Sequence, residues 1–366
     1  MVPHTREEER MTTMADVARR AGVSVATVSH VLNGTRPVRP ATRAAVLGAI
    51  DELGYTHNTL ARALVTSRTR SIGLAVSAIS NPYFTEILQG VEAGALAAGY
   101  SLLIADPHDD PRHERTVVQL LHERRVDGVI VAPSAEPAEM VEYLARRAVP
   151  AVFLDRLVGD AHDQVCAENT DPVCQLVEHL ADLGHTRIGL VAGLPGLSTT
   201  TERVEGYREG LGARGLPFVP ALLAGGNSEA AGAQAATRQL LASAEPPTAL
   251  ITANNAMTIG ALRALRELGR AVPHDIALAC FDDFSWAELF TPRLTAIAQP
   301  SKDIGAAAVR LLLERLAEPD RPPRTLRLPC TFVHRTSCGC PEPAPAGRPA
   351  APQAARPAAQ ERNRTP

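Results

Sequence analysis

The sequence predicts an α/β protein in which a small all-helical head precedes a larger domain of two lobes, each built on a doubly wound parallel sheet. Residues 13–53 show short helical patterns separated by turn signals. From Ser71 onward, apolar strand-like runs alternate with amphipathic helical stretches, the pattern of parallel sheets covered by crossover helices. The run beginning near Asp171 repeats the rhythm of the run beginning near Ser71, so we expect two similar lobes with a ligand cleft between them.

The predicted strands are short continuous runs of Val, Ile, Leu and Ala, a composition typical of strands buried on both faces. They span residues 71–76, 101–105, 128–132, 151–154, 187–191, 249–252 and 276–280. The predicted helices carry apolar residues at three- and four-residue spacings. They span residues 83–98, 113–124, 171–183, 202–214, 256–268 and 301–316.

Basic residues are concentrated near the N-terminus, although the chain of 366 residues has a formal net charge of −3. Between Met11 and Arg70, eight arginines stand against Asp16, Asp51 and Glu52, a local balance of 8 − 3 = +5. Such a segment favours a polyanionic partner, but a solvated arginine-rich surface would have the same composition.

The two ends of the chain carry no targeting signal of the secretory type. Residues 1–10 are charged and predicted to be flexible, and no apolar run reaches membrane-spanning length. Residues 341–366 are rich in Pro, Ala and Arg and predict a disordered tail. We therefore expect a cytoplasmic, nucleoid-associated protein with no membrane partner.

Six cysteines form neither a disulfide framework nor a paired CxxC zinc pattern. Cys338 and Cys340 could bind a metal or sense oxidants. Two thiolates alone make an incomplete zinc site, so an incidental pair near the tail is the favoured interpretation. The sequence predicts no metal site and no cofactor. The cysteines are Cys166, Cys174, Cys280, Cys330, Cys338 and Cys340.

Residues 13–53 carry the signals of a helix-turn-helix followed by a third helix over 41–53. Thr13 and Asp16 have the spacing of a capping box, with Asp in place of Glu, before a helix that ends near Ala21. Gly22 suits the positive φ of a tight turn, and Ser24 can cap a second helix over 25–32.

The second of these helices presents two faces. Its inward residues and their partners on the first helix are predicted to form the head's core: Val17, Ala18, Val23, Val28 and Leu32. Its outward residues near the start are Val25, Ala26, Thr27 and His30, the place where a recognition helix meets base edges in the major groove. An ordinary helical hairpin that only packs on its neighbours would show the same spacing.

Several motifs recur in an order and spacing that resemble the LacI/GalR family of bacterial transcriptional regulators. The head contains TMADVARRAGVSVATVSHVLNG, and the rest contains IGLAV, NPYF, VDGVI, GHTRIGLVAG, ERVEGYREGL, LTAIAQP and HRTS. The resemblance covers residues 12–338. It implies a head over 11–57, a hinge helix and linker over 58–70, and an effector-binding and dimerisation domain over 71–340 that resembles periplasmic sugar-binding proteins.

The resemblance also implies which residues of the head contact DNA. Val25, Ala26, Thr27 and His30 match the base-reading face, and Arg36 matches a further contact. Residues 59–64 match a hinge helix that folds on the operator, in which Ala61 lies against DNA and Leu64 inserts into the minor groove as an apolar wedge. A linker residue packed on the larger domain is the alternative for Leu64. His57 replaces the family's usual proline, which weakens the expected stiffness of the hinge start.

Effector-facing positions of the family match six residues of the larger domain, namely Tyr83, Phe84, Asp155, Arg203, Asn255 and Asp282. Tyr83 and Phe84 would serve equally well as core residues. Arg203, predicted near a helix start, needs a partner, and Glu202 or Glu205 could be that partner instead of a ligand. Asn255 replaces a common Asp, and Asn227 replaces a common aromatic residue. A sugar is the favoured effector, with a purine, a polyol or a phosphorylated metabolite as alternatives.

The predicted function is a repressor that binds duplex DNA and whose operator affinity is controlled by a small molecule. Each head reads a half-site, so a homodimer on a pseudo-palindrome is expected, and the tail lacks the leucine heptad of a tetramer. Whether the effector releases or tightens DNA stays open. An enzyme is not predicted, because GxSxG, HExxH, P-loop and GxGxxG motifs are missing. A transport solute-binding protein would need an export signal and no head.

Overall fold

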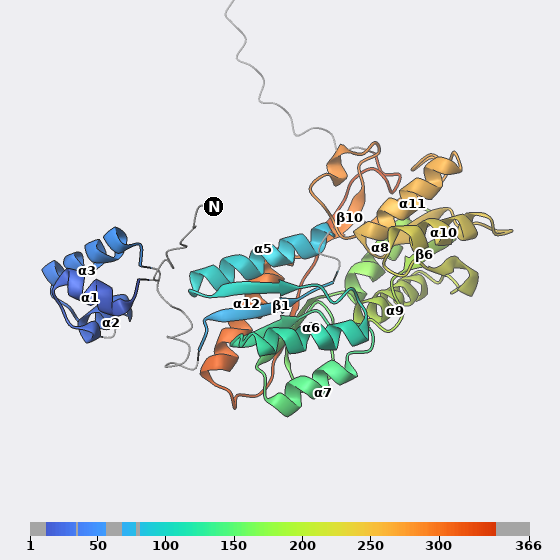
Figure 1. The fold of residues 1–366 in the computed structure, drawn as a ribbon. Helices are drawn as coiled ribbons and strands as arrows, with labels where there is room; N and C mark the ends of the chain where they lie inside the picture. Colours follow the sequence, from blue (N-terminus) through green and yellow to red (C-terminus); the bar gives the residue numbers. More distant parts are fainter. Residues whose placement is uncertain (1–11, 34–35, 56–67, 78–80, 342–366) are drawn as a thin grey trace, which may run out of the picture. The chain divides into compact units, whose positions relative to one another are not determined.

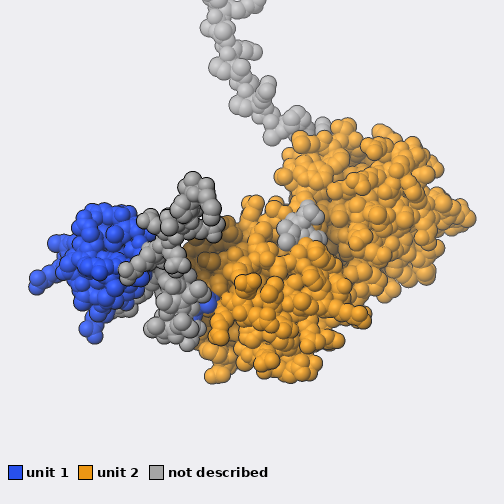
Figure 2. Space-filling view, in the orientation of Figure 1, with its two compact units in different colours: residues 1–69 blue, residues 70–366 orange. Residues whose placement is uncertain are grey.

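The computed structural model describes residues 12–33, 36–55, 68–77 and 81–341. The chain forms two compact units, residues 1–69 (the head) and residues 70–366 (the body), which Figure 2 colours separately. Within the described part, no helix has both the length and the apolar character needed to cross a membrane. The predicted flexible N-terminus, most of the predicted hinge and the predicted tail lie outside the described residues.

The head consists of helices α1 (Met14–Ala21), α2 (Val25–Asn33) and α3 (Pro40–Leu53), as predicted to within one residue at each end. The capping box is formed. The Thr13 hydroxyl accepts the backbone N–H of Asp16 at 3.3 Å, and the Asp16 carboxylate accepts that of Thr13 at 3.0 Å. Gly22 has φ of 67°, and the Ser24 hydroxyl oxygen accepts the backbone N–H of Thr27 at 3.1 Å.

The core of the head is small, and one predicted member differs. Its buried residues are Val17, Ala18, Val28, Val31, Val46, Ala49 and Tyr55. Val31, three residues after Val28, is buried where the sequence pattern predicted Leu32. Val23 and Leu32 are only partly buried at the edge of this cluster. The three helices thus hold each other through valine and alanine contacts.

The body contains two six-stranded sheets with the same strand order. The first sheet has the order β11-β5-β4-β3-β1-β2 and the second has the order β12-β10-β9-β8-β6-β7. The first is formed by β1 (Ser71–Ala75), β2 (Ser101–Ala105), β3 (Gly128–Val131), β4 (Ala151–Leu154), β5 (Asp163–Ala167) and β11 (Thr325–Leu328). The second is formed by β6 (Ile188–Ala192), β7 (Leu223–Gly225), β8 (Ala249–Thr252), β9 (Ala277–Phe281), β10 (Thr295–Ala298) and β12 (Thr331–Val333).

Every strand pair is parallel except β10 with β12. The predicted doubly wound parallel sheets are confirmed, with this one antiparallel pair at the edge of the second sheet. The reason is that β12 follows β11 of the other lobe after two residues, with no helix to return the chain to the starting end of the second sheet.

Helices cover the sheets as a doubly wound fold requires. In the first lobe, α5 (Pro82–Ala97) and α12 (Ser301–Ala317) form one buried layer with the sheet, and α6 (Pro111–Glu123) and α7 (Ala138–Arg147) form another (Figure 1). In the second lobe, α8 (Thr170–Asp182) packs against α9 (Ser198–Ala213), and α10 (Ala230–Leu241) packs against α11 (Asn255–Glu267). Short 3-10 turns occur at Pro220–Leu222 and Ala287–Leu289.

The seven predicted strands and six predicted helices are present, but the sequence pattern missed five strands and two helices. The missed elements are β5, β7, β10, β11 and β12, and helices α7 and α10. β7 and β12 have three residues each, and β11 has alternating exposed residues typical of an edge strand. Helix α9 begins at Ser198 rather than at the predicted residue 202, because its first turn, STTT, has few apolar residues to mark it.

The two predicted lobes exist, but they are interleaved in sequence. The first lobe comprises residues 70–167 and 301–328, and the second comprises 170–298 and 331–341. The chain passes between them three times, at residues 168–169, 299–300 and 329–330, which we call the crossings. The sequence pattern located the first crossing near Asp171 and gave no sign of the other two.

Paired helices approach so closely that glycine is required at their contacts. A methyl group on Gly305 of α12 would collide with the backbone of α5 at Ile87 and Val91, and one on Gly90 would collide with the carbonyl of Lys302. Gly206 of α9 has the same relation to α8. These contacts leave no side-chain atoms that could give way, because the opposing atoms are backbone.

We expect Gly305→Ala to lower the free energy of unfolding by about 1–3 kcal/mol or more, because the added methyl group must push α5 and α12 apart. The matched control is Gly212→Ala in α9, where nothing lies within 4 Å of the added carbon. There alanine should stabilise the helix by up to about 1 kcal/mol. Urea unfolding followed by circular dichroism measures both; equal effects of the two substitutions would contradict the packing argument.

Candidate DNA-reading helix and ligand cluster between the lobes

The first residues of helix α2 are accessible to solvent on one side of the helix. Val25 is 47% exposed, Ala26 is exposed, and Thr27 and His30 are half-buried. The Thr27 hydroxyl lies 2.9 Å from that of Ser24 at the start of the helix. The predicted base-reading residues are thus accessible to different degrees on one short helix. Ala61 and Leu64 lie outside the described residues, so the structure does not bear on their predicted roles.

Exposed arginines follow α2 in the sequence. Arg36, Arg39 and Arg43 are exposed. In contrast, Arg19 and Arg20 form ion pairs with Asp16 and with Glu52. Of these three exposed residues the motif comparison singled out only Arg36. Arg39 and Arg43 were visible only as part of the positive balance of residues 11–70.

In the body, two aspartates occupy equivalent places at the junction of the lobes. Asp155 directly follows β4 and Asp282 directly follows β9, the third strands of their sheets in the same order. Both are buried, at 6% and 3% exposure, and both have left-handed backbones, with φ of 66° and 73°. Aspartate tolerates this conformation better than most residues. The carboxyl ends of parallel strands are where α/β sheets place ligand-binding groups.

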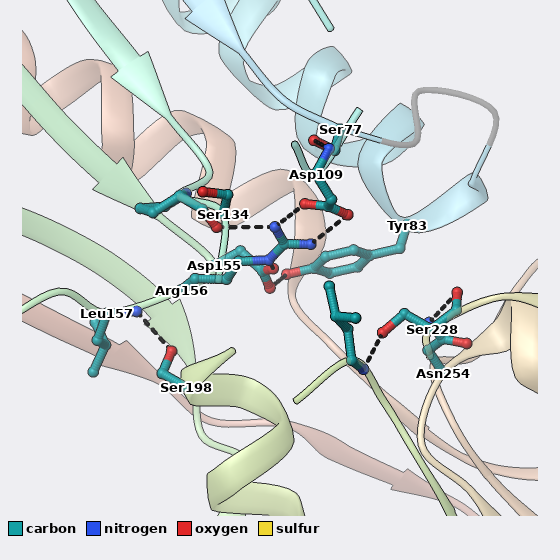
Figure 3. A network of polar contacts seen from close by, with 12 residues as sticks. Ser77, Tyr83, Asp109, Ser134, Asp155, Arg156, Leu157, Ser198, Ser228 and Asn254 are labelled. Carbon is teal, nitrogen blue, oxygen red and sulfur yellow. Dashed lines mark hydrogen bonds and ion pairs between the residues drawn. The ribbon is translucent and has the colours of Figure 1, made fainter. Parts of the chain in front are cut away.

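The first lobe contributes a network around Asp155. The Tyr83 hydroxyl donates a hydrogen bond of 2.6 Å to the Asp155 carboxylate (Figure 3). Arg156 is buried and pairs with Asp109, and it donates to the Pro133 carbonyl at 2.9 Å. Phe84 packs into the first-lobe core and lies 5.9 Å from the Arg156 guanidinium. The two alternatives for Tyr83, a core residue and a polar residue of the site, therefore both apply. Its ring packs in the first-lobe core, and its hydroxyl belongs to the polar network.

The second lobe contributes Arg203. It is buried and lies in the second turn of α9, and its guanidinium is 3.8 Å from the centre of the Phe281 ring. Its Nε donates to Asn169 Oδ1 at 2.8 Å, and its Nη1 donates to the Ala253 carbonyl at 2.5 Å. Neither Glu202 nor Glu205 is its partner, contrary to the alternative considered from sequence. Glu202 instead accepts from Asn169 and from Arg327.

Polar atoms without partners lie around Asp282. Gln299 Nε2 donates to Asp282 Oδ1 at 2.5 Å, and the Asn255 backbone N–H donates to Oδ2 at 3.2 Å. Both side-chain polar atoms of Asn255 and the Oε1 atom of Gln299 are buried, and none has a hydrogen-bond partner among the described residues. A buried polar atom left in this state is unfavourable by about 1–3 kcal/mol. A ligand with hydroxyl groups would satisfy these atoms.

The charges of the two lobes act on each other at this place. Burial, and then Asp155, raises the pKa of Tyr83 well above its ordinary value, and Asp282 and Arg203 of the other lobe are near enough to contribute. Burial also raises the pKa of Asp282, an effect that Arg203 opposes. We call Tyr83, Asp155, Arg203, Asn255, Asp282 and Gln299 the junction cluster.

Two members of the cluster bond directly to the crossings. Arg203 bonds to Asn169 of the first crossing, and Asp282 bonds to Gln299 of the second. A hydrogen bond between the lobes lies nearby. The Ser198 hydroxyl of the second lobe accepts the backbone N–H of Leu157 of the first lobe at 2.8 Å (Figure 3). Sequence reasoning missed Asn169 and Gln299. For Gln299 a signal existed, since it belongs to the LTAIAQP motif. Asn227, singled out from sequence, is exposed in the turn after β7.

Comparisons with known proteins agree over both units. The profile of bacterial regulatory proteins of the lacI family matches residues 13–58, and that of periplasmic binding protein-like domains matches residues 177–338. The HTH-type transcriptional repressor PurR of Pectobacterium carotovorum (strain PC1) is 34% identical over 330 residues, which are 89% of this chain and 97% of the relative. The ribose operon repressor of Escherichia coli K12 is 35% identical over 329 residues, 89% of this chain and 100% of the relative.

The chain belongs to the lacI family of bacterial regulatory proteins. Among solved structures, the lac repressor dimer bound to operator and the anti-inducer ONPF is similar with a TM-score of 0.80 and 31% identity. The alignment covers 90% of this chain and 99% of the lac repressor chain. A complex of the transcriptional regulator CelR with cellobiose is similar with a TM-score of 0.70 and 32% identity, over 89% of this chain and 99% of that one.

Family membership confirms several predictions from the sequence. The chain is a DNA-binding transcriptional regulator with a helix-turn-helix head and a periplasmic-binding-protein-like body, and it is not an enzyme. Like other members of the family, it binds operator DNA and a small-molecule effector.

Replacing Arg203 by lysine should lower the free energy of unfolding by about 1–3 kcal/mol, because an ammonium group cannot keep the bonds to Asn169 and Ala253 and the contact with Phe281 together. The control is Arg208→Lys on the same helix, where the guanidinium is exposed and stacks on Phe218. Denaturant unfolding of the two variants measures the difference. Equal stability would mean that Arg203 does not hold the junction.

Proposed function

We propose that α2 reads an operator half-site and that the junction cluster holds a neutral sugar, whose binding changes the operator affinity of a homodimer. The observation that carries the effector assignment is the set of unpartnered buried atoms on Asn255 and Gln299 beside Asp282. Hydroxyl groups both donate and accept, so a polyhydroxylated ligand can satisfy an amide nitrogen, amide oxygens and carboxylates at one time.

The charges of the cluster favour a neutral ligand over a phosphorylated one. Asp155 and Asp282 place two carboxylates at the junction. The two guanidinium groups nearby are already bonded, Arg203 to Asn169 and Ala253 and Arg156 to Asp109 and Pro133. A phosphate would thus meet two carboxylates but the charge of only one guanidinium, that of Arg203, because Arg156 is already paired with Asp109. Sugar complexes of relatives agree with this choice, since a family regulator from Enterococcus faecium carries ribose and CelR carries cellobiose.

A route from effector to DNA runs through the crossings. A sugar that bonds to Asp155 in one lobe and to Asp282 or Asn255 in the other stabilises one arrangement of the lobes over another. Because Arg203 and Asp282 bond to crossing residues, that arrangement is coupled to the segments on which the lobes turn. The effector shifts the populations of two states with different operator affinity.

On the DNA side, Val25, Ala26, Thr27 and His30 are assigned to base edges and Arg36 to a further contact. Arg39 and Arg43 are added as phosphate contacts because they are exposed and basic. Ala61 and Leu64 are assigned to the minor groove, with Leu64 as the wedge. A homodimer on a pseudo-palindrome follows from the need to join two half-sites, and the lac repressor bound to its operator is a dimer.

His30→Ala and Arg36→Ala should affect DNA binding in different ways. His30→Ala should reduce discrimination at one base pair of each half-site about 10- to 100-fold, because a base-edge contact is lost. Arg36→Ala should weaken binding to all sequences alike and lower the slope of log affinity against log salt by about 2 for a dimer, one phosphate contact per head. Ala45→Ser, on the exposed part of α3, is the control.

Two experiments measure these effects. Selection of genomic fragments by the purified protein measures base preference, and fluorescence anisotropy across salt concentrations measures the salt slope. The recovery of a palindrome supports the head assignment. Unchanged base preference in His30→Ala would remove that residue from the reading face, and an unchanged salt slope in Arg36→Ala would remove the phosphate contact.

Asp282→Asn should weaken sugar binding about 10- to 100-fold, because a charged acceptor at the centre of the cluster becomes neutral. The matched control, Asp320→Asn, alters an exposed aspartate outside the cluster and should bind as the unaltered protein does. Calorimetry with pentoses, hexoses, purine bases and phosphorylated sugars identifies the class of ligand. Binding of a purine or of phosphorylated sugars alone would overturn the neutral-sugar assignment; equal affinity of the two variants would overturn the site.

A further inference from the structure

Four metal-ligating side chains that are not part of the junction cluster meet in the second lobe. They are His179, His334, Cys338 and Cys340, which we call the C-terminal cluster. One ligand atom from each lies within 4.8 Å of the other three. The sequence offered only the two cysteines, which are an incomplete site by themselves, and folding adds two histidines to them.

We propose that the C-terminal cluster is a structural zinc site with two thiolate and two imidazole ligands. Two sulfur and two nitrogen donors, with no carboxylate among them, suit zinc rather than magnesium or calcium. Four protein ligands leave no open position for a water or a substrate, which distinguishes a structural site from a catalytic one. Two thiolates balance the charge of a divalent ion.

The distances fit tetrahedral coordination. Zinc bonds of about 2.3 Å to sulfur and about 2.1 Å to nitrogen, at tetrahedral angles, separate sulfur from nitrogen by about 3.6 Å. Cys338 Sγ lies 3.6 Å from His334 Nε2, and Cys340 Sγ lies 3.9 Å from His179 Nε2. The remaining pairs, all within 4.8 Å, need to shorten by about 1.4 Å at most.

The backbone explains why these residues converge. β12 pairs with β10 through Val333 and Ala296, so the chain leaves the sheet at His334. Ser337 is fixed to the sheet, since its hydroxyl donates to the Leu278 carbonyl at 2.6 Å and accepts the Thr295 N–H at 2.8 Å.

The turn after Ser337 brings the second cysteine back. Gly339, with φ of 97°, allows Cys340 to reach the same point as Cys338. His179 comes from the last turn of α8 and contacts His334 edge to face, with ring centres 5.0 Å apart. Three ligands therefore come from the segment 334–340 that follows β12, and one comes from helix α8.

A neighbouring hydroxyl supports a thiolate at Cys338. The Thr295 oxygen accepts the backbone N–H of Arg335 at 3.1 Å, and its own proton points to Cys338 Sγ at 3.2 Å. Residues that bond to metal ligands in this way hold the ligands in place. Cys338 is fully buried, and His334 is exposed, so the cluster lies at the surface with one ligand inside.

Metal analysis of the full chain, expressed without a histidine tag and kept reduced, tests the proposal. We expect about one zinc per chain, and after exchange with cobalt the intense visible absorption of a tetrahedral thiolate complex. Cys340→Ser and His179→Gln should each lose most of the zinc. Cys174→Ser, which alters a cysteine of α8 outside the cluster, should keep it.

Each outcome decides for or against the site. Zinc that is retained in both ligand variants would be bound elsewhere, and the proposal would fail. A folded protein without zinc in zinc-supplemented buffer, or a Cys338–Cys340 disulfide in its place under reducing conditions, would also overturn it. Should a variant fail to fold, the cobalt spectrum of the unaltered chain decides, since only a thiolate site gives the intense bands. None of these measurements depends on DNA or effector binding.

Discussion

Parallel strands impose the constraint from which the rest of this structure follows. A parallel sheet places all of its strand carboxyl ends on one edge, and the connecting helices must return along the faces. With the same strand order in both sheets, the residues that follow β4 and β9 occupy equivalent places, which is how Asp155 and Asp282 come to share one junction. Their left-handed backbone conformations mark a tight turn of the chain at each of these two places.

Under the proposed function, this arrangement makes the junction cluster sensitive to the position of the lobes. Arg203 and Asp282 are each bonded to a crossing residue, so the groups assigned to the effector are also groups that restrain the crossings. The unpartnered buried atoms of Asn255 and Gln299 support the same proposal, since such atoms are unfavourable until a ligand bonds to them. Under this proposal, effector binding and restraint of the crossings use the same few side chains.

Local signals in the sequence were sufficient for the head and for most of the body. Thr13, Asp16, Gly22 and Ser24 act on neighbours only a few residues away, which is why α1 and α2 could be predicted closely. Strands such as β1 and β4 are buried on both faces and are marked by their apolar composition.

What the sequence could not provide depends on contacts between distant segments. Edge strands β11 and β12 have partners far away in the chain and little apolar pattern of their own. The return of α12 to the first lobe, the bond from Asn169 to Arg203, and the approach of His179 to Cys340 join residues separated by tens to more than a hundred positions. Motif matching found Asp155, Asp282 and Arg203, because their neighbours in sequence are distinctive, and missed Asn169 for lack of such neighbours.

The interleaving of the lobes determines the order in which they can be completed during synthesis. The first lobe begins at residue 70, but α12, which covers one face of its sheet, and β11, which closes one edge, lie after residue 300. A nascent chain that has released residues up to 300 therefore has an apolar face of β1, β3 and β4 covered only by α5 on that side. The ribosome must therefore deliver residues 301–328 before the lobe that was started first can close, and until then α12 cannot cover that apolar face.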